Sequence, residues 1–175
     1  VRDHTYTRAN IVAGVNQSLA RMKTDHLDAV QFHGPPPAEA VEDAIQSLRD
    51  LKDEGKIRFL GVSSSLPYIV DHLNMGVFDE FQIPYSALQR EHEDVITRSA
   101  DAGIGTVIRG GLAQGEPGEG RGRDETWRKF DDARLDDLRE EGESRSAFVL
   151  RFTLAHPEIH TIIAGTKNHD HLREN

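Results

Sequence analysis

Apolar residues recur every three or four positions in several segments of the chain, which is the spacing of one face of an α-helix. The first such segment carries Ile11, Val15, Leu19 and Met22, and it follows Thr7, a residue type that caps helix starts. The same periodicity predicts six further helices. They cover Val41 to Leu51 before Gly55, Tyr68 to Met75 before Gly76, Val95 to Ala100 before Gly103, Trp127 to Leu138, Ser144 to Leu154 before Pro157, and a last helix that opens at Gly165 and Thr166.

Short apolar runs between these helices predict β-strands. They are Leu27 to His33, Ile57 to Ser63, Phe78 to Pro84, Ile104 to Ile108, and Thr161 to Ala164. Strands separated by helices favour parallel βαβ units, because neighbouring parallel strands need a crossover connection. The fold class is therefore α/β. Periodicity alone leaves two architectures open, a doubly wound sheet and a (β/α)₈ barrel.

The residues at the strand ends favour the barrel. The first four strands end on or near polar side chains, namely His33, Ser63, Gln82 and Arg109. In a barrel these carboxyl ends meet at one mouth, where catalytic and binding groups collect. A doubly wound sheet binds nucleotides through a glycine-rich fingerprint or a P-loop after a strand, and neither pattern occurs in this sequence. The segment 110–124 is rich in glycine and charge, and it is long enough for a mobile functional loop.

Composition narrows the function classes. The chain has 175 residues, a formal charge of −9 and no cysteine, which predicts a single domain without disulfides, thiolate zinc sites or a cysteine nucleophile. The negative charge and the lack of a basic block argue against nucleic-acid binding. No apolar run approaches the roughly 18 residues of a membrane span, and the start, Val1 to His4, has no apolar signal core, so a cytoplasmic location is expected. His169 and His171 do not predict a metal site, because residues two apart do not share a helical face.

Three blocks of the sequence resemble the aldo-keto reductase family in their order and spacing. They are Asp25 to His33, Leu51 to Ser64, and Ile163 to Asn168 followed by Glu174 and Asn175. The resemblance covers essentially the whole chain and implies a (β/α)₈ barrel that binds a nicotinamide cofactor and reduces carbonyl compounds. It places residues 1–175 in the later part of that barrel, from the connection after the third strand to the start of the helix after the eighth.

The resemblance implies roles for the strand ends. His33 matches the histidine of the family's catalytic tetrad, and a neutral imidazole can donate a hydrogen bond to the oxygen on which charge develops during hydride transfer. Ser63, Ser64 and Gln82 match residues that bind the carboxamide of the nicotinamide, for which hydroxyl and amide groups supply donors and acceptors. Arg109 stands where many relatives have an aromatic residue that stacks on the nicotinamide, and a guanidinium plane can also stack.

Two further segments are implied to hold the rest of the cofactor. The first offers backbone amides to the pyrophosphate, and the second offers a helix start and a lysine to the phosphate on the adenosine ribose. From the first segment come Gly110, Leu112 and Gln114; from the second come Gly165, Thr166, Lys167 and His171 at the phosphate, with Glu174 and Asn175 at the adenine. Lys167 therefore predicts NADPH as the preferred cofactor over NADH, and no metal is expected.

Two functions stay open at this point. One is an NADPH-dependent reductase of a small carbonyl substrate, an aldehyde or a ketone; the other is a catalytically silent barrel that binds the cofactor as a regulatory or interaction subunit. The aspartate, tyrosine and lysine of the tetrad are not matched in residues 1–175, and five strands fall short of a complete barrel of about 250 residues. We therefore expect this chain alone to be inactive, and to be poorly soluble or dimeric because an edge strand is unpaired. The substrate and the oligomeric state stay open.

Overall fold

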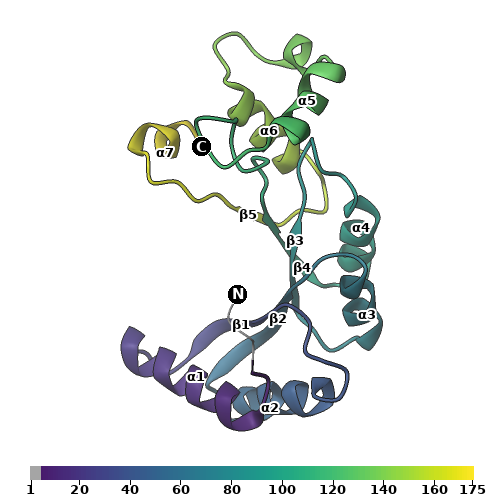
Figure 1. Cartoon of the computed structure of the whole chain (residues 1–175). Coiled ribbons are helices and arrows are strands. Elements are labelled where there is room, and N and C mark those ends of the chain that lie inside the picture. Colours follow the sequence, from purple (N-terminus) through teal and green to yellow (C-terminus); the bar gives the residue numbers. More distant parts are fainter. Residues whose placement is uncertain (1–4) are drawn as a thin grey trace. The chain divides into compact units, whose positions relative to one another are not determined.

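The computed structural model describes residues 5–175, in which seven α-helices alternate with five β-strands (Figure 1). The strands form one parallel sheet in the order β1-β2-β3-β4-β5, which confirms the predicted α/β class. By its contacts the chain divides into two compact units, Val1–Phe81 (unit 1) and Gln82–Asn175 (unit 2). None of the helices in residues 5–175 is both long and apolar enough to span a membrane. The start without a signal core, Val1 to His4, lies outside the described residues, and the single domain and the cytoplasmic location stay predictions.

Unit 1 has the elements that the apolar pattern predicts, and each local signal acts as expected. Its elements are α1 Arg8–Met22, β1 Leu27–His33, α2 Val41–Asp53, β2 Ile57–Ser63 and α3 Tyr68–Met75. At the start of α1, the Thr7 hydroxyl accepts a hydrogen bond from the backbone N–H of Asn10. Gly55 and Gly76, with φ of +74° and +62°, adopt the left-handed conformation that follows a helix end.

The most deeply buried aliphatic side chains of the unit 1 core include several from α2, β2 and α3. Among them are Leu48, Leu51, Ile57, Leu60, Val62 and Ile69. On the sheet, the amide of Gln31 donates a hydrogen bond to the Glu80 carboxylate. The Gln31 side chain passes close to Gly61, where a Cβ would lie 2.8 Å from its Cγ. Gly61 lies on β2, between the strands that carry Gln31 and Glu80, and its lack of a side chain leaves room for this hydrogen bond to cross β2.

Unit 2 continues the alternation with small shifts of the predicted strand ends. Its elements are β3 Glu80–Pro84, which begins in unit 1, α4 Glu93–Asp101, β4 Gly105–Arg109, α5 Asp124–Asp132, the 3₁₀ helix η1 Leu135–Leu138, α6 Arg145–Leu154, β5 Thr161–Ile163 and α7 His169–Glu174. Strand β3 begins two residues later than expected, β4 is shifted by one residue, and β5 ends one residue earlier. The Ser144 hydroxyl caps α6 by accepting from the N–H of Ala147, at 3.1 Å.

The single helix expected from Trp127 to Leu138 is wrong, because the chain breaks into α5 and η1 at Arg134. This residue has a φ of +52° in the left-handed region. Asp131 and Asp132 fill the last turn of α5, where negative side chains oppose the helix dipole. Arg145 binds both Asp131 and Asp136, which stabilises the bent arrangement. The apolar residues keep a helical spacing up to Leu138, but the acidic residues at 131 and 132 end the helix before it.

The start expected for the last helix, at Gly165 and Thr166, is also wrong. Helix α7 begins at His169, and the Asn168 side chain caps it by accepting from the N–H of Asp170 at 2.9 Å. The Thr166 hydroxyl accepts from the N–H of Asn168 at 3.0 Å, so it forms a local turn in place of a helical bond. The segment 165–168 is therefore a loop, and its backbone does not form a helix N-terminus at Gly165.

The loop 110–124 is polar, as predicted, but it is folded back on itself and partly anchored in the core. Ala113 is buried in a cluster with Leu88, Trp127, Phe130, Phe148 and Val149. Backbone hydrogen bonds close the loop, including one of 2.8 Å from the N–H of Arg121 to the carbonyl of Gln114. A Cβ on Gly122 would lie 1.8 Å from the carbonyl oxygen of Gly115. The glycines of this loop thus allow two backbone segments to touch.

An exposed histidine just before β5 holds the buried start of β4, and its removal should destabilise unit 2. His160 Nδ1 accepts a hydrogen bond of 3.1 Å from the backbone N–H of Thr106, a fully buried residue. His160→Ala leaves this N–H without a partner, which should lower the free energy of unfolding by about 1 to 3 kcal/mol. His160→Asn can supply an acceptor there and should recover part of the loss. Urea unfolding of both variants and of the exposed control His169→Ala tests this, and equal losses for Ala and Asn would contradict it.

Candidate functional site

In unit 1, the polar ends of β1 and β2 lie side by side. His33 is opposite Ser63 in the strand register, and the N–H of Gly34 donates to the carbonyl of Ser63 at 2.9 Å. The Tyr6 hydroxyl donates toward the carbonyls of His33 and Gly34, each at 3.1 Å. The structure therefore brings His33 and Ser63 together, with the His33 side chain exposed and its backbone held by Tyr6. Nothing in the sequence pattern pointed to this role of Tyr6.

Ser64 directly follows β2 and is 4% exposed. Its hydroxyl oxygen is buried and makes no hydrogen bond with any residue of the described chain. Burying a hydroxyl without a partner is unfavourable, so the fold around Ser64 leaves one polar group unsatisfied.

In unit 2, Gln82 lies within β3 and Arg109 ends β4. The N–H of Tyr85 donates to the carbonyl of Arg109 at 3.3 Å, which joins the ends of the two strands. Burial lowers the pKa of the Arg109 guanidinium. Burial also lowers the pKa of His92, and the charge of Arg109 adds to that effect while Glu91 opposes it. A basic group thus stands at the end of β4, where the family resemblance leads one to expect an aromatic ring.

Unit 2 also contains a pocket of about 790 Å³ between the glycine-rich loop, the start of α6 and the segment 163–175. Nine of the residues predicted to bind a cofactor line it. They are Gly110, Leu112, Gln114, Gly165, Thr166, Lys167, His171, Glu174 and Asn175. Residues more than fifty positions apart in the sequence therefore meet around one cavity, and its size is typical of ligand sites.

Other residues line this pocket without having been predicted. Glu116, Glu119 and Arg121 belong to the glycine-rich loop, and Ser144 and Ser146 stand at the start of α6. The N-cap pattern of Ser144 was visible in the sequence, but nothing there indicated that α6 begins beside the loop. The charges of the loop were visible too, and only the fold shows which of them face the cavity.

The two cations of the pocket wall have no partner among residues 5–175. Neither Arg121 nor Lys167 forms an ion pair there, whereas the neighbouring arginines do. The backbone N–H groups of Leu112 and Gln114 donate no hydrogen bond to any described residue. This combination of unpaired cations and free amides is suited to an anionic ligand.

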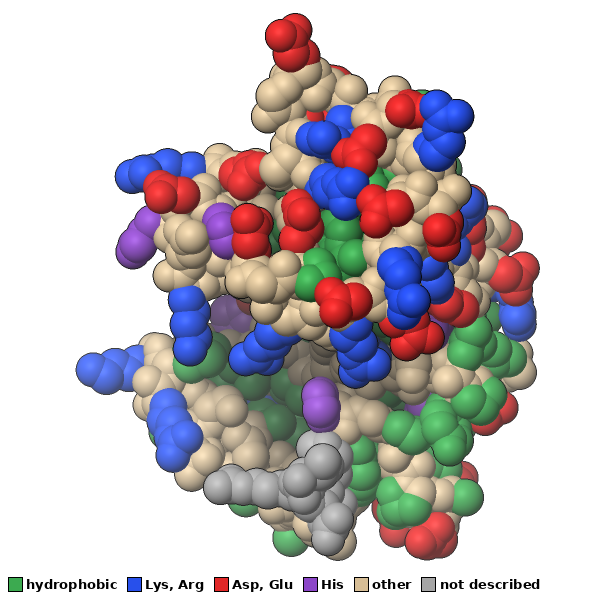
Figure 2. Space-filling model, turned by 45° about the horizontal axis from the view of Figure 1, so that its top comes forward, with side chains coloured by type: hydrophobic (Ala, Val, Ile, Leu, Met, Phe, Trp, Pro, Cys, Tyr) green, Lys and Arg blue, Asp and Glu red, His purple; other side chains and the backbone are tan. Residues whose placement is uncertain are grey.

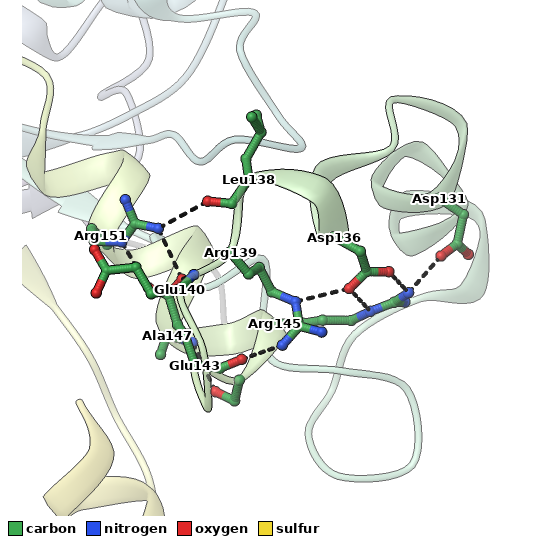
Figure 3. A network of polar contacts seen from close by, with 10 residues as sticks. Asp131, Asp136, Leu138, Arg139, Glu140, Glu143, Arg145, Ala147 and Arg151 are labelled. Carbon is green, nitrogen blue, oxygen red and sulfur yellow. Dashed lines mark hydrogen bonds and ion pairs between the residues drawn. The ribbon is translucent and has the colours of Figure 1, made fainter.

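A network of ion pairs holds the chain that leads into α6 (Figure 3). Arg145 binds Asp131 at 2.8 Å and also Asp136, which in turn accepts from Arg139. Arg151 donates to both carboxylate oxygens of Glu143, at 2.7 and 2.8 Å. In the space-filling view, acidic and basic side chains lie side by side over the part that carries α5 and α6 (Figure 2). The network fixes the residues just before the pocket-lining Ser144.

Acid should weaken this network through Glu143. Hydrogen bonds from Arg151 lower the pKa of Glu143 from its usual 4.5 to about 2, with smaller contributions from the N–H of Glu140 and the charges of Arg151 and Arg139. The stabilisation is therefore full above pH 4.5 and is lost as the pH falls towards 2. Glu143→Gln should lower stability at neutral pH and should flatten the loss in this acid range. Urea unfolding against pH measures both, and parallel curves for the two proteins would count against this role.

In the described part of the chain, no group of three or more His, Cys, Asp or Glu side chains is arranged to hold a metal ion.

Comparison with known proteins gives consistent matches. The model of the aldo/keto reductase family matches residues 2–175. The chain is 26% identical over 183 residues to the uncharacterized oxidoreductase YqkF of Bacillus subtilis, covering 97% of this chain and 60% of the relative. It is 36% identical over 110 residues to the aldo-keto reductase YhdN of Bacillus subtilis, covering 62% of this chain and 33% of the relative.

Solved structures show the same likeness. The holo form of the aldo-keto reductase AKR11C1 from Bacillus halodurans has a TM-score of 0.78 and 27% identity, over 96% of this chain and 58% of that protein. An aldo/keto reductase from Klebsiella pneumoniae in complex with NADP and acetate has a TM-score of 0.77 and 22% identity, over 97% of this chain and 59% of that protein. Such neighbours are (β/α)₈ barrels, and the sheet with its alternating helices matches part of that fold, as predicted. The chain spans about three fifths of the length of these structures.

Proposed function

The chain belongs to the aldo/keto reductase family, and from that membership we propose that it forms part of an oxidoreductase that reduces an aldehyde or ketone with NADPH. The observation that carries the proposal is the pocket of unit 2, because nine residues predicted from two separate segments line it together. When bound, the nicotinamide cofactor supplies the hydride for the reduction.

The residues of the pocket fit the phosphate-bearing half of such a cofactor. Lys167 would pair with the phosphate on the adenosine ribose, and the free amides of Leu112 and Gln114 would donate to the pyrophosphate. Glu174 and Asn175, at the far end of the same lining, would meet the adenine. The loop character of 165–168 removes the expected contribution of a helix dipole at Gly165, so the charge of Lys167 carries more of this role.

The strand ends would serve the reacting half. The buried hydroxyl of Ser64, which lacks a partner in the described chain, would pair with a carboxamide together with Ser63 of the same unit. The amide of Gln82, in unit 2, would supply a donor and an acceptor to a carboxamide as well. The exposed imidazole of His33 would donate a hydrogen bond to the substrate carbonyl oxygen and stabilise the charge that develops there. Arg109 would stack on the nicotinamide through its guanidinium plane.

Cofactor binding gives the direct test. Titration of the chain with NADPH should change the cofactor fluorescence at micromolar concentrations, whereas no change across that range would refute the proposal. Turnover is tested by following NADPH oxidation with a simple aromatic aldehyde, using the protein as the cell produces it. Residues 1–175 expressed alone should bind NADPH without reducing the aldehyde, because they contain His33 but no match to the other three residues of the tetrad.

A further inference from the structure

Two of the three glutamates that line the proposed cofactor pocket belong to the glycine-rich loop. Glu116 and Glu119 line the same cavity as Lys167 and Arg121, on the wall formed by the glycine-rich loop. An anionic ligand that pairs with the two cations would therefore share this cavity with the two acidic side chains. Because like charges repel, these carboxylates oppose the binding of any phosphorylated ligand.

The backbone of the loop fixes both carboxylates on this wall. The carbonyl of Glu116 accepts hydrogen bonds from the N–H groups of Glu119, at 3.2 Å, and Gly120, at 2.9 Å. This turn places residues 116 and 119 close together, as two positions three apart are in one helical turn. A Cβ on Gly120 would lie 2.5 Å from the carbonyl oxygen of Gln114, so the turn is packed against the start of the loop.

The surroundings of Glu116 favour the protonated form of its carboxyl group. Burial raises the pKa of Glu116, and the neighbouring charge of Glu119 raises it further. Among the more distant groups of unit 2, Arg145 and Arg139 oppose this rise and Asp136 adds to it. The remaining charged or titratable side chains around the cavity are Arg121, Lys167, His171 and Glu174. In residues 5–175, neither Glu116 nor Glu119 forms an ion pair.

We propose that Glu116 and Glu119 limit the affinity of this pocket for phosphorylated ligands through their negative charge, and that the loss of the Glu116 charge makes that affinity rise as the pH falls. The inference rests on the proposed function, because it assumes that a phosphate occupies the pocket. Protonation of Glu116 removes its part of the repulsion, so acid tightens binding as long as the ligand keeps its own charge. The two residues thereby set how strongly the pocket discriminates between phosphorylated and neutral ligands.

The probe is adenosine 2′,5′-bisphosphate, and adenosine is the neutral comparison. Calorimetric titration of the whole chain at about pH 5.5 and about pH 8 compares a more protonated with a less protonated Glu116, whose pKa burial raises. Glu116→Gln with Glu119→Gln should bind the bisphosphate about three- to tenfold tighter at the higher pH, the scale of one or two charge interactions at a protein surface. The bisphosphate affinity at the lower pH, divided by that at the higher pH, should be smaller for this double variant than for the unchanged chain. Adenosine binding should not change.

The ligand phosphates also titrate in this range, but they do so equally for both proteins, so the comparison between proteins isolates the carboxylates. Glu125→Gln, an exposed substitution in the first turn of α5 outside the pocket, is the control and should behave as the unchanged chain. Equal bisphosphate affinities with and without the two glutamates would overturn the inference. Loss of adenosine binding in the double variant would also overturn it, because the side chains would then be needed to hold the loop. Absence of bisphosphate binding by every protein at both pH values would instead contradict the proposed function.

Discussion

Lys167→Ala is expected to weaken the binding of NADPH about ten- to a hundredfold, because a charge-assisted contact contributes about 1.5 to 3 kcal/mol. Lys167 lines the pocket of unit 2 and forms no ion pair within residues 5–175, so its charge is available to a ligand phosphate. NADH lacks the phosphate on the adenosine ribose, and its affinity should stay the same. Titration of both cofactors by fluorescence gives the two affinities.

Arg173→Ala is the matched control for this change. Arg173 is a cation on the same segment, but it is exposed, pairs with Asp170 at 3.1 Å and does not line the pocket. It should leave both affinities unchanged. An equal loss of NADH and NADPH binding by Lys167→Ala would mean that the lysine supports the shape of the pocket and does not select the phosphate. No change in either affinity would remove Lys167 from the site.

The sequence predicted the elements of unit 1 well, because each boundary there rests on a strong local signal. Thr7 can cap a helix with its own hydroxyl, and Gly55 and Gly76 adopt a backbone conformation that other residues avoid. These effects act over three or four residues, so the order of residues along the chain is enough to predict them. The polar strand ends His33 and Ser63 meet because β1 and β2 are neighbouring parallel strands, whose carboxyl ends lie at the same edge of the sheet.

The errors lie where contacts distant in the sequence decide the local structure. The break at Arg134 depends on Arg145, which binds acidic residues on both sides of it. The late start of α7 depends on a choice between two capping residues, Thr166 and Asn168, and both are good caps by residue type. Propensity alone does not rank such alternatives.

The candidate site shows the same division. Residue types and the family resemblance led to Lys167 and Gln114, and the fold brings both to one cavity. Glu116, Glu119 and Arg121 were visible only as part of a polar loop, because their direction depends on how the loop folds back. The closure of that loop is therefore the structural feature on which the site depends most.

Gly122→Ala is expected to open this loop and to abolish most binding of adenosine 2′,5′-bisphosphate. An added Cβ would lie 1.8 Å from the carbonyl oxygen of Gly115 and 2.6 Å from Nε1 of Trp127. The first of these contacts is with backbone, so the clash cannot be relieved by rotating a side chain. Overpacking of this kind costs about 1 to 3 kcal/mol, and here the strain falls on the segment that carries the pocket wall.

The measurement can use the protein's own fluorescence. Trp127 is the only tryptophan in the sequence and is 4% exposed, so its emission reports directly on the packing beside Gly122. Gly122→Ala should shift this emission to longer wavelength, as water reaches the ring, and calorimetry should show the loss of bisphosphate binding. Gly14→Ala is the matched control, because a Cβ on that helical glycine meets no atom within 4 Å. It should keep both the emission and the binding, since alanine favours a helix over glycine by about 0.8 to 1 kcal/mol. Unchanged emission and binding in Gly122→Ala would show that the loop tolerates a side chain at this position, and that its tight closure does not support the pocket.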